Sequence, residues 1–344
     1  QQIRLNTGDE GSSFELLNTD TDITSLVINY DIGWATITNA SSWIDHSAVS
    51  EQDITFSFLS SEPGYYDNNS TTDVFTEELR LATQFDGGLQ FVMGLYYEDR
   101  ERDLNTHHVW SGASDQVPAA FQTLPISLFG DNAKTEQKAL FGEVSYAITE
   151  QISTTFGARF FDYEKEELKS FTSRGNVRYT DRQFLIEETG QSYKAVINYT
   201  PNDDILVYAQ WAEGFRLGSG GFQSAACDAV LPEPFTVPDV ESDTSENIEL
   251  GIKTSFAENR IIFNAALFQV NWDDLPIRLT DPCTHTLNGG KAQSQGIELE
   301  FQSALTENIK LDMSASYIDA TLEETSSIGI KGDRLPGSAD VNYS

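Results

Sequence analysis

The residues of this chain that could do chemistry are few and widely spaced. His107 and His108 precede Trp110 in a polar segment. Adjacent residues on an extended chain point in opposite directions, so a shared metal ion would be awkward there. None of the four histidines has the spacing of a metalloprotease or hydrolase motif. We therefore expect solvated loop residues, no catalytic site and no enzyme.

Two further segments resemble ligand sites in composition only. The run GSGG from Gly218 to Gly221 lacks the lysine and the strand-to-helix setting of a phosphate-binding loop. The run DNNSTTD from Asp67 lacks the ordered carboxylates and the distal glutamate of a calcium loop. The sequence therefore predicts no bound cofactor and no metal site.

The chain has two cysteines, Cys227 and Cys283, which are far apart and have no second pair of metal ligands nearby. They suit a disulfide better than a metal site. Each falls in a long polar segment, and the two segments lie on the same side of the fold predicted below. In an oxidising exterior a bond between them would join two neighbouring loops, whereas two free thiols are the alternative.

Contact with a polar ligand is best supplied by aromatic and arginine side chains in long loops, because they offer stacking area and fixed hydrogen-bond geometry. Two of the candidates, Arg216 within GFR and Phe222 within GGF, have the alternative of only shaping a strand end and a loop. The candidate ligand contacts are Tyr65, Tyr66, Trp110, Arg174, Arg178, Arg216 and Phe222.

Composition limits the elements that could position these residues. The formal charge of −33 argues against a nucleic acid partner. No apolar run reaches the roughly 18 to 20 residues of a spanning helix, and the densest run is 261–272. The 39% of hydrophobic residues is ample for strands, because only one face of a strand needs to be apolar.

Period-2 alternation is the main structural signal, and it is clearest around the turn at 86–88. After this turn the residues from Leu89 to Tyr97 alternate between an apolar and a polar face. Aromatic residues near the strand ends are typical of the girdles at a membrane interface. They are Tyr96, Tyr97, Phe160, Phe161, Tyr208, Trp211, Phe268 and Trp272.

Short turns alternate strictly with long polar segments. The turn signals lie at 31–33, 86–88, 149–151, 201–204, 258–260 and 306–308. The predicted loops span roughly 47–72, 103–135, 166–188, 217–243, 281–290 and 323–334. Antiparallel hairpins in a barrel sort their connections in this way, and a Greek-key sandwich has no reason to. We expect an all-β fold, an antiparallel transmembrane β-barrel of about thirteen strands, with short periplasmic turns and long extracellular loops.

Several segments resemble the barrel of TonB-dependent receptors, in the same order along the chain. They include TEELRLATQFDGGLQFVMGLYYEDRE from Thr76, FGEVSYAITEQISTTFGARFFDYEKE from Phe141 and YKAVINYTPNDDILVYAQWAEGFRLGSGGF from Tyr193. The pattern continues through TSENIELGIKTSFAENRIIFNAALFQVNWDDLPI from Thr244, LNGGKAQSQGIELEFQSAL from Leu287 and GDRLPGSA from Gly332.

This resemblance implies an integral barrel of the bacterial outer membrane, surrounded by outer-membrane lipid. It implies a small-molecule ligand such as a metal chelate, and energy from the TonB-ExbB-ExbD system acting through a plug domain. The chain shows no segment that resembles the plug or the closing strands. We therefore expect residues 1–344 to be a single partial β-barrel domain, a fragment of the receptor.

The leading interpretation is a receptor that takes up a scarce nutrient, with ferric siderophores as the commonest cargo of the resembled family. A passive outer-membrane channel shares every barrel feature and differs in an open lumen. A soluble secreted protein that binds carbohydrate through loop aromatics is a third interpretation. An outer-membrane hydrolase, the fourth, would require a histidine that converges with an acid or a serine in the loops.

Overall fold

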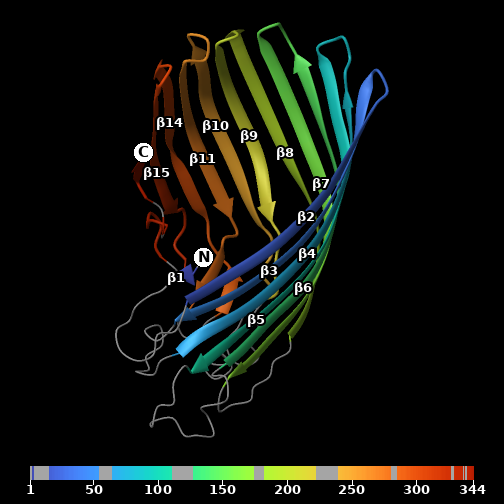
Figure 1. Ribbon diagram of the computed structural model, residues 1–344, viewed down its shortest axis with the longest axis vertical. Coiled ribbons are helices and arrows are strands. Elements are labelled where there is room, and N and C mark those ends of the chain that lie inside the picture. The colour runs from blue at the N-terminus through green and yellow to red at the C-terminus, as the bar shows by residue number, and fades with distance from the viewer. Residues whose placement is uncertain are drawn as a thin grey trace.

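The computed structural model describes residues 2–3, 15–53, 64–110, 127–173, 182–221, 239–279, 285–326, 329–335, 337 and 339–344. These residues form one large curved antiparallel sheet (Figure 1), in which each strand pairs with its neighbours in chain order. The sheet has 14 strands, and a two-stranded hairpin stands apart from it. Within the described part of the chain, no helix is long and apolar enough to cross a membrane.

The bounds of the strands show that most of them are long. The large sheet contains β1 (Gln2–Ile3), β2 (Glu15–Asp31), β3 (Ala35–Asp53), β4 (Gly64–Thr83), β5 (Leu89–Trp110), β6 (Ser127–Ala147), β7 (Ile152–Ser173), β8 (Arg182–Asn202), β9 (Ile205–Arg216), β10 (Asp243–Phe256), β11 (Ile261–Asp273), β14 (Ala292–Thr306), β15 (Ile309–Leu322) and β16 (Val341–Tyr343). The separate hairpin contains β12 (Pro276–Leu279) and β13 (His285–Asn288).

The predicted short turns are confirmed, and all of them lie at one end of the sheet, the upper end in Figure 1. Between β2 and β3, Gly33 has a φ of 90°, which favours glycine. Its backbone N–H donates to Asp31 Oδ1 at 2.6 Å. Between β8 and β9, the N–H of Asp204 donates to Asn202 Oδ1 at 3.0 Å. Side chains of Asp and Asn thus replace missing backbone partners at the hairpin tips.

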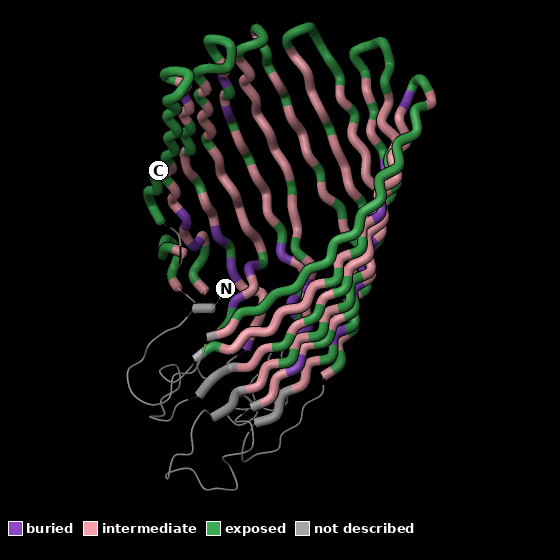
Figure 2. Tube along the Cα trace, viewed as in Figure 1, coloured by how far each residue is buried: buried purple, intermediate pink, exposed green. Residues whose placement is uncertain are grey.

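The two faces of the sheet differ as the alternation predicts. On β5 the large apolar side chains of Met93 and Leu95 are 57% and 56% exposed, whereas Glu98 on the other face is buried. Exposed and less exposed residues alternate clearly along β8, whereas β2 is exposed almost throughout (Figure 2). A contiguous apolar surface of this kind is stable only against another apolar medium, and lipid supplies it.

The strands continue well beyond the apolar band, which corrects the predicted loop bounds. On the apolar face of β7, Phe156 and Phe160 are followed at alternate positions by Asp162, Glu164 and Glu166. The backbone ladder continues through this polar part of the wall. The sequence predicts loops here because these segments have no apolar residues at alternate positions to indicate a strand.

This correction affects three of the candidate ligand contacts. Tyr65 and Tyr66 lie in β4 and pair with Asp53 and Gln52 of β3. Trp110 lies at the end of β5 and pairs with Gly64. All three were expected in loops and lie in strands instead.

The aromatic girdle is confirmed only in part. Trp43, Phe75 and Tyr97 form a row across the apolar face, with ring centroids 5.3 Å and 6.3 Å apart. Tyr96 and Phe161, by contrast, lie on the polar face, where they belong to a packed cluster. Because adjacent strand residues point to opposite faces, the neighbours Tyr96–Tyr97 and Phe160–Phe161 each place only one ring toward lipid. Phe268 and Trp272, four positions apart on β11, both lie on the polar face.

Candidate ligand-binding site

The best-packed region of the polar face lies on β6 and β7, beyond the apolar band. Its buried core is Ala139, Phe161 and Tyr163. The ring of Phe161 stacks on Phe215 with centroids 3.7 Å apart and planes 9° from parallel. Residues of lesser burial that pack on this core are Tyr96, Ile186, Phe215 and Leu217.

A glycine creates the space for this cluster. Gly190 of β8 is the cross-strand partner of Phe161, and a Cβ placed on it would lie 2.2 Å from the Phe161 ring. Any larger residue would therefore displace the ring. The local sequence ETGQ thus allows an aromatic side chain to lie flat across β8, where the next segment of the chain can pack on it.

That segment is residues 217–221, which we call the strap. It follows β9 and lies against the polar face of β7 and β8. The N–H of Gly218 donates to Tyr163 Oη at 3.0 Å, and the N–H of Gly220 donates to Glu167 Oε2 at 2.5 Å. The carbonyl of Gly220 accepts from Lys169 Nζ at 2.6 Å. The strap belongs to no strand, so its backbone groups lack strand partners. Side chains of β7 bond to these groups instead.

Glu167 is the centre of these contacts and is only 3% exposed. Its carboxylate lies 2.8 Å from Lys165 Nζ and 3.3 Å from Lys169 Nζ. Burial on its own raises the pKa of this carboxyl, but the two ammonium groups and the Gly220 N–H outweigh burial and lower the pKa below its ordinary value. A buried charge is tolerated here because it is paired and hydrogen-bonded.

The other stem of the same loop is fastened nearby. Val240 and Ser219 exchange backbone hydrogen bonds of 2.8 Å, which brings the two ends of the loop together. Ser242 Oγ donates to Glu188 Oε2 at 2.6 Å, and Tyr163 Oη donates to the same oxygen at 2.8 Å. Both ends of the 217–242 connection are therefore attached to β7 and β8.

The loop is also attached to the β12–β13 hairpin. The N–H of Glu241 donates to Asn288 Oδ1 at 2.7 Å, and Asn288 Nδ2 donates to the carbonyl of Glu241 at 3.0 Å. The hairpin packs against the large sheet in an apolar cluster that includes Leu275, Ile277 and Leu322. Neighbouring long loops are thus connected at their bases by hydrogen bonds and packing.

Arg216, a candidate ligand contact, closes the strand end before the strap. Its Nε and Nη2 donate to the two carboxylate oxygens of Asp243 at 2.9 Å and 2.8 Å. The guanidinium lies 5.4 Å from the centre of the Trp272 ring, and Trp272 Nε1 donates to Asp243 at 2.5 Å. The side chain thus joins β9, β10 and β11, which is the strand-shaping role that the sequence left open.

The other candidates are not brought together by any described contact. Those that lie outside the described residues are Arg174, Arg178, Phe222, Cys227 and Cys283. The predicted loop at 166–188 hides the strand positions of Glu167 and Lys169, and Lys165 lies just before that loop. Alternation of charge at 165, 167 and 169 on one face of β7 is the signal that would have found them.

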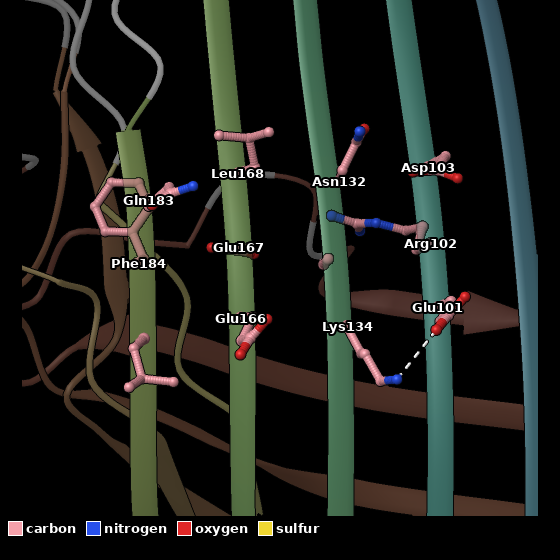
Figure 3. A pocket seen from close by; sticks show the side chains of 12 residues that line it. Glu101, Arg102, Asp103, Asn132, Lys134, Glu166, Glu167, Leu168, Gln183 and Phe184 are labelled. Atoms are coloured by element: carbon pink, nitrogen blue, oxygen red, sulfur yellow. Dashed lines mark ion pairs between the residues drawn. The ribbon is translucent and has the colours of Figure 1, made fainter.

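A groove of about 470 Å³ crosses β5 to β8, and Figure 3 shows the side chains that line it. Lys134 Nζ and Glu101 form an ion pair of 3.2 Å across β5 and β6. Most lining residues continue the apolar face beyond its apolar band, so this groove lies on the outside of the wall. Among the described residues, no group of three or more His, Cys, Asp or Glu could hold a metal ion.

Comparison with known proteins identifies the class to which this two-faced wall belongs. Residues 3–344 match the family described as TonB dependent receptor-like, beta-barrel. The chain belongs to this family, and the sheet is part of the wall of a β-barrel in the bacterial outer membrane. Its apolar face is therefore the lipid-facing face, and its polar face lines the lumen.

The individual proteins that match this chain have low sequence identity to it. The probable TonB-dependent siderophore receptor PiuA of Acinetobacter baumannii is 22% identical over 289 residues, which are 74% of this chain and 37% of that protein. The metal-pseudopaline receptor CntO of Pseudomonas aeruginosa is 24% identical over 181 residues, 52% of this chain and 23% of that protein.

Solved structures show the same fold. The ferric yersiniabactin uptake receptor FyuA of Yersinia pestis has a TM-score of 0.76 at 19% identity, covering 98% of this chain and 48% of that chain. The siderophore receptor PiuA of A. baumannii has a TM-score of 0.73 at 15% identity, covering 96% and 52%. This chain thus spans about half the length of these structures.

The Arg216–Asp243 ion pair can be tested as a contact that joins the ends of β9 and β10. Asp243 is 4% exposed, so Arg216→Ala would remove two hydrogen bonds from a buried carboxylate. The Arg216 side chain is 60% exposed, so we expect a loss of about 1.5 kcal/mol of unfolding free energy, the lower end for hydrogen bonds to a charged group. A double-mutant cycle with Asp243→Asn measures the coupling in the whole protein. Additive changes in unfolding free energy for the two substitutions would show that the two side chains do not interact.

Proposed function

We propose that the whole protein is an outer-membrane receptor that takes up a ferric siderophore by active transport. The observation that carries the proposal is membership of the receptor family, joined to a lumen-facing wall whose long-loop end carries an inward-folded strap. The names of the relatives support it, because PiuA and FyuA are both receptors for siderophores. In this proposal the iron chelate is cargo, and the chain has no catalytic role.

The proposal includes two partners beyond lipid. A small-molecule metal chelate would bind at the long-loop end of the lumen, and the TonB-ExbB-ExbD system would supply energy through a plug domain. Residues 1–344 would act as a single partial barrel domain within that assembly. The polar lumen wall supports this arrangement, because charged side chains such as Glu298 and Lys253 there can contact a polar plug.

Candidate ligand contacts remain those of the long-loop end. Arg216 is less suited than the others, since Asp243 engages one edge of its guanidinium and the Trp272 ring lies against the group. We propose Tyr65, Tyr66, Trp110, Arg174, Arg178 and Phe222 as the residues to test first, because each belongs to or borders a long connection at that end.

A gene deletion tests the proposed transport. Cells that lack the whole protein should take up their own siderophore, loaded with radiolabelled iron, at the rate of cells that lack TonB. Restoring the gene should restore uptake only when TonB is present. Uptake that is unchanged by the deletion would overturn the proposal. A large steady ion current through the purified whole protein would instead favour a passive channel.

We also propose that Cys227 and Cys283 form a disulfide between the β9–β10 and β11–β14 loops. The support is that the described stems of these loops are already hydrogen-bonded through Glu241 and Asn288. Outer loops face an oxidising exterior, in which disulfides persist.

Peptide mass mapping with and without reductant checks this bond in protein purified from the membrane. The two cysteine peptides should migrate as one species until the reductant is added, because the bond joins them covalently. Alkylation of both thiols without reductant would show that the cysteines are free.

A further inference from the structure

The strap is held by side chains that the proposed transport does not itself require. Four residues of β7, at alternate positions on the lumen-facing side, contact it: Tyr163 Oη accepts from the N–H of Gly218, Lys165 Nζ donates to the carbonyl of Gly218 at 3.3 Å, Glu167 accepts from Gly220, and Lys169 donates to the carbonyl of Gly220. The strap makes no strand pairing with β7 or β8 among the described residues. Its position on this wall therefore depends on side-chain contacts.

Two glycines make this close approach possible. A Cβ on Gly220 would lie 2.4 Å from the ring of Phe184, and a Cβ on Gly218 would lie 2.5 Å from the carbonyl oxygen of Val240. The strap backbone thus lies directly on an aromatic ring on one side and on the returning stem of the loop on the other. A larger residue at Gly220 forces the strap away from the wall, and one at Gly218 forces it away from the stem.

The strap covers a distinct surface. Beneath it lie the rings of Phe161 and Phe184 and the ammonium groups of Lys165 and Lys169, whose side chains are each 15% exposed. In a chain with 21 basic residues against 54 acidic ones, two covered lysines on one strand are a concentrated positive charge.

We propose that Lys165, Glu167 and Lys169 form a latch that holds the strap over this aromatic and cationic part of the lumen wall. Glu167 acts as the positioning residue, since it joins both lysines and the strap backbone. When the latch opens, the strap and the stem at 239–242 move away together, because Ser219 and Val240 bond them to each other. The covered lysines and rings then face the lumen.

Hydrogen exchange of the whole protein in lipid nanodiscs tests the latch. Glu167→Gln keeps the shape of the side chain but removes the charge that both lysines share. We expect the amides of Gly218 and Gly220 to exchange at least about tenfold faster, with β9 and β10 still protected. Glu164→Gln is the matched control, because Glu164 lies on the opposite face of the same strand. Unchanged exchange in Glu167→Gln would overturn the proposal.

A steric variant opens the latch by a different route. Gly220→Ala should displace the strap while leaving all three latch side chains in place. Lys165 and Lys169 should then react faster with an amine reagent than in the parent protein. Gly87→Ala is the control, since a Cβ there meets no atom within 4 Å. Slow reaction of both lysines in Gly220→Ala, with the strap amides exposed, would show that the strap is not what covers them. Protection lost throughout β9 and β10 would also contradict a local latch.

Discussion

The constraint on which this structure depends is that backbone N–H and C=O groups have no water to bond to inside a membrane. Every strand in the lipid must therefore pair on both edges, which favours long antiparallel strands in chain order. The registers from β2 to β11 are nearly unbroken, with one irregularity between Tyr199 and Asn202. Once the backbone is paired in this way, the side chains are free to differ completely between the two faces.

Beyond the apolar band, the same backbone ladder carries charged side chains on both of its faces. On the outer face, Asp22, Asp45 and Asp73 lie directly opposite one another on adjacent strands. Such like-charged pairs cost stability and are tolerated here in an exposed setting. On the inner face, Glu167 is buried and paired with two lysines. The excess negative charge of the chain thus lies more on these outer-face positions than on the lumen wall at the strap.

Which elements could be predicted from the sequence depends on whether they lie inside or beyond the apolar band. The turns at 31–33 and 86–88 were predictable because turn chemistry is local. The strands within the band were predictable because lipid imposes an apolar face at alternate positions. The parts of β4 and β5 near the long loops were not, since both faces are polar there and the ladder alone defines them. The contacts of Glu167 with the strap join residues 53 positions apart, and no local pattern specifies such a pairing.

The central claim is that each strand has one lipid-facing side within the band, and that the same side faces water beyond it. The most direct measurement places a spin label at successive positions of β7 in the whole protein in lipid bilayers. Accessibility to oxygen, which concentrates in lipid, should peak at Phe156, Ala158 and Phe160, and fall at Gly157 and Arg159. From Asp162 onward a water-soluble relaxation agent should reach the same face. Oxygen peaks that continue through Glu166, or that fall on Arg159 and Phe161, would contradict the account.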